Sequence, residues 1–101
     1  MRLKDHVVLI TGGSRGVGAA VARAVAREGA HVALAGKTLE PHPKLPGTLN
    51  SVAEEIREIG REALVVQTDV RDPDQVQMMI DKTIEHFGRI DALINNAGAI
   101  Y

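Results

Sequence analysis

A glycine-rich stretch near the amino terminus, residues 11–18 (TGGSRGVG), most constrains how this chain can fold. An apolar run at residues 6–10 precedes it, and an alanine-rich segment with helical spacing, residues 19–27, follows it. A strand, a glycine-rich turn and a helix in this order are the context in which such a turn binds phosphate. Glycines let the backbone turn sharply, and the first turn of the helix presents unpaired N–H groups to an anion. An ordinary strand-to-helix loop is the alternative, but the flanking segments favour a nucleotide.

The rest of the chain continues this alternation of short apolar runs and amphipathic helices. We expect strands at residues 6–11, 31–35, 63–66 and 90–94. We expect the first helix to begin near Arg15 or Gly16, the second to span residues 49–59 after an N-cap at Thr48, and the third to open at Pro73 and stop at Gly88. The apolar stripe of the first helix is predicted to be Val17, Ala20, Val21, Ala24 and Val25. The buried face of the second is predicted to be Leu49, Val52, Ala53, Ile56 and Ile59, and the stripe of the third Val76, Met79, Ile80, Ile84 and Phe87. Three prolines in residues 38–47 exclude regular structure there.

This βαβαβαβ pattern predicts the α/β class: a Rossmann-like, doubly wound parallel sheet with helices on both faces. Right-handed crossovers give four strands in the order 3-2-1-4. Ligands of such sheets bind in the crevice above the carboxyl ends of the strands where the strand order reverses, here strands 1 and 4.

Composition excludes several classes of function. One Phe, one Tyr and no Trp argue against a base-stacking surface, and a net charge of −1 gives no attraction to nucleic acid or an anionic membrane. The absence of cysteine excludes disulfides and thiolate chemistry, and the four histidines are not at metal-ligand spacing. The chain opens without a signal peptide, and no apolar run approaches the ~18 residues that span a bilayer. We therefore expect a cytoplasmic protein without a metal site.

The end of the second predicted strand indicates which nucleotide binds. Proteins that bind NAD usually have an acidic residue about 20 residues after the glycine turn, where it binds the ribose hydroxyls. Here that region holds Gly36 and Lys37 instead. A glycine followed by a cation leaves room and charge for the 2′-phosphate of NADP, and Arg15 can approach the same phosphate. We therefore expect NADP, with NAD as the less favoured cofactor; the alternative is that both cations are ordinary surface residues.

Two further sets of polar residues follow predicted strands. Asp69 and Val70 follow the third strand and could bind adenine through a carboxylate and an N–H; alternatively, Asp69 only caps the loop before Pro73. Residues 95–98 (NNAG) follow the fourth strand at the crevice. Buried amides must be hydrogen-bonded, so Asn95 could also tie neighbouring strands together, and both roles can hold at once.

The glycine turn, Asp69-Val70 and Asn95-Asn96-Ala97-Gly98, in this order and spacing, resemble the short-chain dehydrogenase/reductase family over the whole chain. Residues 37–48 and 53–56 more narrowly resemble its hydroxysteroid dehydrogenase-like 2 subgroup. The resemblance implies hydride transfer between NADP(H) and a small carbonyl or alcohol substrate. The cofactor-binding residues it implies are Gly12, Gly13, Ser14, Arg15, Gly16, Val17, Gly18, Lys37, Asp69, Val70, Asn95, Ala97 and Gly98.

The resemblance also implies that residues 1–101 are the amino-terminal part of a single NADP-binding domain. The family's catalytic Ser and Tyr-x-x-x-Lys follow the fourth strand, so no catalytic residue is assigned here, and Tyr101 has no such lysine after it. A nucleotide-binding module without chemistry of its own is the alternative function. Residues 92–94 are apolar on both faces, as in the middle of a parallel sheet, so an exposed edge there predicts a homo-oligomer.

Overall fold

The computed structural model describes residues 2–12, 16–36 and 49–96, in which strands and helices alternate. The elements are β1 (Val7–Thr11), α1 (Gly16–Arg27), β2 (His31–Gly36), α2 (Leu49–Ile59), β3 (Ala63–Gln67), α3 (Pro73–Phe87) and β4 (Ala92–Asn95). The predicted alternation is confirmed, and the predicted bounds lie within two residues of these. The proline-containing loop and the proposed N-cap Thr48 lie outside the described residues.

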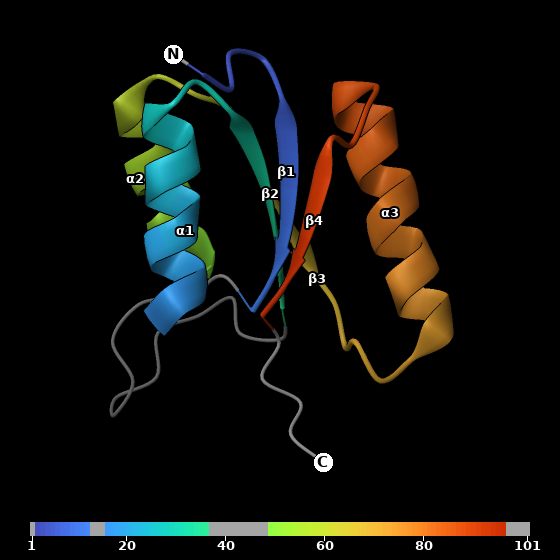
Figure 1. Ribbon diagram of the computed structural model, residues 1–101. Coiled ribbons are helices and arrows are strands. Elements are labelled where there is room, and N and C mark those ends of the chain that lie inside the picture. The colour runs from blue at the N-terminus through green and yellow to red at the C-terminus, as the bar shows by residue number, and fades with distance from the viewer. Residues whose placement is uncertain (1, 13–15, 37–48, 97–101) are drawn as a thin grey trace.

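The four strands form one parallel sheet in the order β3-β2-β1-β4, as predicted. Helices α1 and α2 cover one face of the sheet, and α3 lies on the opposite face (Figure 1). Strand β1 lies between β2 and β4, and all five of its residues are buried. In the register, Leu9 lies opposite Ala33 of β2 and Leu93 of β4. The strand order therefore reverses at β1.

The core has one layer on each face of the sheet. Under α1 and α2, the side chains of Ile10, Leu34 and Ile56 are fully buried, and Leu9, Val66 and Met79 are buried in the layer under α3. Each of these larger side chains contributes about 1.5–3 kcal/mol through burial of its apolar surface. The two layers together fix the sheet that presents the strand ends.

The predicted stripe of α1 is only partly right. Val17 is 69% exposed, and the helix instead buries the alanines Ala19, Ala22 and Ala26 against the sheet. Val21 and Val25 are half-buried and pack at the side of the core. Small side chains on the buried face allow the helix axis to lie close to the sheet, which valine at these positions would prevent.

The predicted stripe of α2 is confirmed, whereas that of α3 is only partly right. Leu49, Val52, Ala53 and Ile56 of α2 are buried. In α3, Met79 and Thr83 are buried, and Ile84 is 46% exposed. The Thr83 hydroxyl donates to the Met79 carbonyl at 2.7 Å, so its polar group is satisfied within the helix and can be buried.

Both ends of α3 follow capping rules. The Asp72 carboxylate accepts a hydrogen bond from the backbone N–H of Asp74 at 2.9 Å, and Pro73 occupies the first turn. Gly88 adopts the left-handed conformation, with φ of +83°, and donates to the carbonyl of Ile84. These caps set the two ends of α3, which connects the carboxyl end of β3 to the amino end of β4.

Strand β4 forms an edge of the sheet, because within the described residues it pairs only with β1. Leu93 is 55% exposed on the face that α3 covers elsewhere. The exposed edge considered for residues 92–94 is therefore observed in the described sheet. At its amino end, the Asp91 carboxylate accepts hydrogen bonds from Arg89 Nη2 at 2.5 Å and from the Val7 backbone N–H at 2.7 Å. The hydrogen bond from Arg89 and, to a smaller extent, that from the Val7 N–H lower the pKa of Asp91.

The two helices on one face are joined by an ion pair between Arg23 of α1 and Glu55 of α2. The hydrogen bond from Arg23 lowers the pKa of Glu55 and raises that of Arg23. Because both side chains keep more than a third of their surface exposed to solvent, the pair contributes little to stability. Among the helices of the described ranges, none combines the length and the apolar character that crossing a membrane requires.

Candidate functional site

The carboxyl ends of β1 and β4 are joined by a network of hydrogen bonds. The Thr11 hydroxyl donates to Asn95 Oδ1 at 2.9 Å. The Asn96 backbone N–H donates to both the hydroxyl and the carbonyl of Thr11, each at 3.1 Å. Asn96 Nδ2 lies 3.4 Å from the carbonyl oxygen of Gly12. The segments that leave these two strands therefore hold each other in place, which confirms the strand-tying role considered for Asn95.

Gly12 begins the glycine turn in a conformation that suits glycine. Its φ is +69°, in the left-handed region, and its N–H donates to the carbonyl of Ala35 at 2.8 Å. Helix α1 begins at Gly16, at the carboxyl end of the sheet (Figure 1). The N-terminal end of a helix attracts anions through its unpaired N–H groups and dipole. This arrangement suits the binding of a phosphate at the end of β1.

Six of the predicted site residues lie outside the described residues: Gly13, Ser14, Arg15, Lys37, Ala97 and Gly98. Of the other residues of the glycine turn, Val17 is exposed and Gly18 is buried in α1. The structure brings Gly12 and Asn95 together at the ends of adjacent strands, and places Asp69 and Val70 beyond β3, at the far side of β2. These predicted residues therefore lie along the carboxyl edge of the sheet, where its parallel strands end.

Gly36, at the end of β2, is not required by local packing. A Cβ atom built there would lie 3.5 Å from Leu49 Cδ1, an ordinary van der Waals contact. The carbonyl of Gly36 accepts a hydrogen bond from the backbone N–H of Thr68 at 2.8 Å, which joins the ends of β2 and β3. This position can therefore accept an added Cβ atom in ordinary contact with Leu49.

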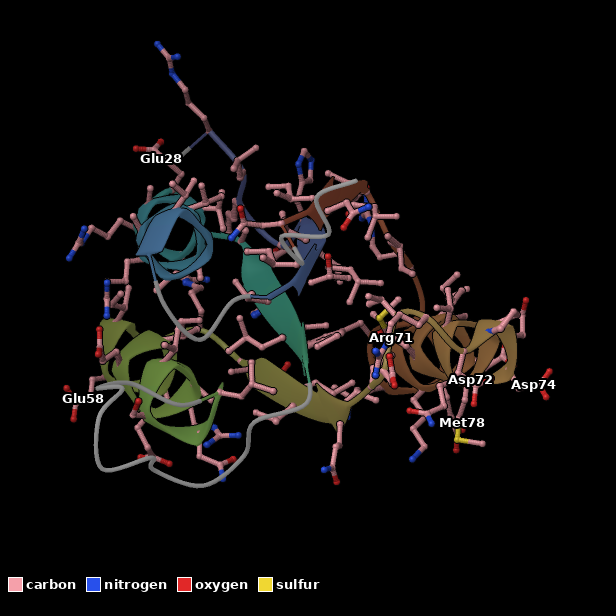
Figure 2. The ribbon with its side chains drawn as sticks, turned by 90° about the horizontal axis from the view of Figure 1, so that it is seen from below. Glu28, Glu58, Arg71, Asp72, Asp74 and Met78 are labelled. Atoms are coloured by element: carbon pink, nitrogen blue, oxygen red, sulfur yellow. The ribbon has the colours of Figure 1, made fainter. Side chains whose placement is uncertain are left out.

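Asp69 follows β3 and contacts the segment that opens α3. Its carboxylate oxygens accept hydrogen bonds from Arg71, and its backbone N–H donates to Gln75 Oε1 at 2.8 Å. The hydrogen bond that Arg71 donates to Asp69 also raises the pKa of Arg71. The loop-capping role considered for Asp69 is thus observed. Figure 2 views the molecule from below, and it places Arg71 nearer the sheet than Asp74, which lies at the outer side of α3.

Thr11 and Arg71 belong to this edge, but the sequence did not single them out as site residues. Thr11 is buried and connects the two central loops. Thr11 ends an apolar strand and stands next to Gly12, and this position was the signal in the sequence that could have identified it. Arg71 stands two residues after Asp69, and this Asp-x-Arg spacing was the corresponding signal for their contact.

The chemistry of this edge is that of binding. At the junction of β1 and β4, the side chains of Thr11, Asn95 and Asn96 supply neutral donors and acceptors, and none of them titrates near neutral pH. Within the ranges that the structure describes, no three His, Asp or Glu side chains lie close enough together to hold a metal ion. The edge can bind a polar ligand along several strand ends and orient it.

Comparisons with known proteins agree with the motifs and the fold. Residues 6–101 match the family described as short chain dehydrogenase. The chain is 50% identical over 99 residues to hydroxysteroid dehydrogenase-like protein 2 of Homo sapiens, covering 98% of this chain and 24% of that protein. The chain therefore spans about a quarter of the length of this relative.

Solved structures are similar over nearly the whole chain. A short chain dehydrogenase from Mycobacterium thermoresistibile is 52% identical, with a TM-score of 0.92, and the match covers 98% of this chain and 35% of that one. Carveol dehydrogenase from Mycobacterium avium, in complex with NAD, is 30% identical, with a TM-score of 0.83, over 97% of this chain and 37% of that one. With the family's sequence pattern matched from residue 6 to residue 101 on the same parallel sheet, the chain belongs to the short chain dehydrogenase family.

Proposed function

We propose that the carboxyl edge of the sheet binds NADP(H), and that residues 1–101 are the amino-terminal, cofactor-binding part of one domain of a dehydrogenase/reductase. The observation that supports this most is the reversal of strand order at β1, with α1 and α3 on opposite faces of the sheet. Dinucleotides bind above such a reversal in open α/β sheets. In the complete enzyme, hydride would pass between the nicotinamide and a small carbonyl or alcohol substrate.

The proposal assigns a part of the cofactor to each strand end. The pyrophosphate would lie at the start of α1, the adenine at Asp69 and Val70 after β3, and the nicotinamide-side ribose near Asn95 after β4. The pyrophosphate-binding residues would be Gly12, Gly13, Ser14, Arg15, Gly16, Val17 and Gly18, and Ala97 and Gly98 would join Asn95 at the ribose. The separation of these strand ends along one edge suits an extended dinucleotide.

The preference for NADP rests on the absence of an acid after β2. Gly36 there leaves space, and Lys37 and Arg15 would supply positive charge for the 2′-phosphate. NAD is the second candidate, because carveol dehydrogenase, which has the same fold, was solved in complex with NAD. The two cofactors differ only in this phosphate, so a charge placed at the end of β2 should distinguish them.

Replacing Gly36 with aspartate should reverse the cofactor preference. The new carboxylate would repel the 2′-phosphate and could accept hydrogen bonds from the ribose hydroxyls of NAD, so NADP affinity should fall about tenfold or more. Titration calorimetry with both cofactors measures this. Gly36→Ala is the matched control, because it adds the same Cβ atom without charge and should leave the preference unchanged. An unchanged ratio of NADP to NAD affinity in Gly36→Asp would contradict the assignment of the phosphate to this strand end.

The proposal assigns cofactor binding, and not proton transfer, to this segment. Reduction of a carbonyl needs a group that protonates the substrate oxygen within hydrogen-bond reach. Thr11, Asn95 and Asn96 at the crevice do not supply one, which is the observation that favours the second class of function, a binding module without chemistry of its own. In the dehydrogenase proposal, residues beyond this segment supply that group.

We also propose that the 101-residue chain self-associates through β4. The strand is at the edge of the described sheet, and its Leu93 is 55% exposed. The backbone N–H and C=O groups of an apolar edge strand can pair with a strand from another chain. Leu93→Lys should therefore shift the chain toward a monomer of 10.8 kDa, which light scattering measures. A parent chain that is already monomeric at the same concentration would exclude this association.

A further inference from the structure

Arg71 holds the carboxylate of Asp69 through three donors. Its backbone N–H and its Nε donate to Asp69 Oδ1 at 3.0 and 3.1 Å, and its Nη2 donates to Oδ2 at 3.1 Å. A guanidinium that contacts both oxygens fixes the plane of a carboxylate as well as its position. The orientation of the Asp69 side chain therefore depends on Arg71.

The backbone of Asp69 is held by the same segment. Its N–H donates to Gln75 Oε1 at 2.8 Å, and its carbonyl accepts from the backbone N–H of Asp72 at 3.0 Å. The main chain of Asp69 would thus remain in place if Arg71 were truncated, while its side chain would lose the two bonds from the guanidinium. The Arg71 side chain is 75% exposed, so this ion pair adds little to stability. Its main consequence is orientation.

We propose that Arg71 is a positioning residue for base recognition, an inference that rests on the proposed function, in which adenine binds at Asp69. Arg71 holds the Asp69 carboxylate in the orientation that accepts a hydrogen bond from the 6-amino group of adenine. A carboxylate offers only acceptors, so a base with a carbonyl oxygen at the same position would place acceptor against acceptor. Sites built around one hydrogen bond reject analogues that cannot make it. Arg71 therefore sets the preference of this edge for adenine.

The test compares NADP with its hypoxanthine analogue, in which a carbonyl oxygen replaces the 6-amino group. Calorimetry on the parent chain should give a preference for NADP of about tenfold or more, the value of one hydrogen bond to a charged group. Arg71→Ala should reduce this preference to about twofold or less, because the Asp69 carboxylate then lacks the guanidinium that fixes its plane. Arg71→Lys keeps the charge without the planar fork, so it should not restore the preference.

Arg89→Ala is the matched control. Arg89 pairs with Asp91, two residues after it, as Arg71 pairs with Asp69, two residues before it. Arg89 is likewise exposed, but it lies before β4, at the opposite end of the strands. Its loss changes the net charge by the same amount as the loss of Arg71. It should leave the preference for NADP over the analogue at the parental value.

The possible outcomes separate this inference from the proposed function. A parent chain that prefers NADP, with a preference lost in Arg71→Ala and kept in Arg89→Ala, supports the positioning role. A preference that persists in Arg71→Ala overturns it, as does a parent chain that binds both cofactors equally, and in both cases dinucleotide binding itself stands. A parent chain that binds neither cofactor overturns the proposed function together with this inference.

Discussion

Replacing Gly18 with valine is expected to abolish dinucleotide binding while the helices persist. Gly18 is buried in the first turns of α1, on a helix whose buried residues Ala19, Ala22 and Ala26 lie close against the sheet. A branched side chain there would push the start of α1 away from the sheet and from the pyrophosphate it is proposed to bind. Overpacking of this kind costs about 1–3 kcal/mol. Calorimetry with NADP measures the binding, and far-UV circular dichroism measures the helices.

Ala20→Val is the control for this variant. Ala20 is exposed on the same helix, so valine there introduces the same β-branched side chain into α1 without contact with the core. It should bind NADP like the parent chain. Gly18→Ala adds a single methyl group and should give an intermediate affinity. Binding by Gly18→Val at parental affinity would show that the start of α1 is not the phosphate site.

Replacing Leu34 with alanine should lower the free energy of unfolding by about 2–5 kcal/mol. Leu34 is fully buried in β2, under α1 and α2, so its truncation leaves a cavity in the larger core layer. Urea unfolding followed by circular dichroism measures the change. Leu93→Ala makes the same substitution on the exposed edge strand and should cost less than about 1 kcal/mol. Equal losses in the two variants would contradict the burial difference between them.

The order of elements and the sheet topology could be predicted because several independent rules agreed. Helix α2 has its polar and apolar residues cleanly separated, so its bounds and its buried face were both correct. The face of α1 could not be predicted in the same way, because alanine and valine alternate along it and both are apolar. Close packing against the sheet selects the smaller residue, and that depends on a distance that periodicity does not contain.

The predicted burial of Ile84 failed for a similar reason. An apolar segment indicates that a residue can be buried, but the neighbouring element decides whether it is. The core layer under α3 includes side chains of β1, β2 and β3, whereas Leu93 of β4 lies outside it and is exposed. Thr83 takes the buried place expected of an apolar residue because its hydroxyl bonds within the helix.

At the site, the sequence predicted which strand ends matter, and the structure added how they are joined. Gly12 and Asn95 were expected at adjacent strand ends and lie there. Their connection through Thr11 could not be predicted, because it links side chains 84 residues apart. The contact between Asp69 and Arg71 depends on the turn before α3, whose geometry follows from the cap at Asp72.

The pairing of β1 with both β2 and β4 has a consequence for the order in which the chain folds. Strand β2 follows β1 after a single helix, whereas the bonds from β1 to β4 close a loop of 84 residues. Contacts that are distant in sequence form late, because the chain between them must be ordered before they gain free energy. The unit β1-α1-β2 is therefore the folding nucleus that we expect, and β4 is the last strand to dock. We therefore expect the junction of Thr11 with Asn95 to form after β1 has paired with β2. A nascent chain should then hold the proposed cofactor only once its fourth strand has been made.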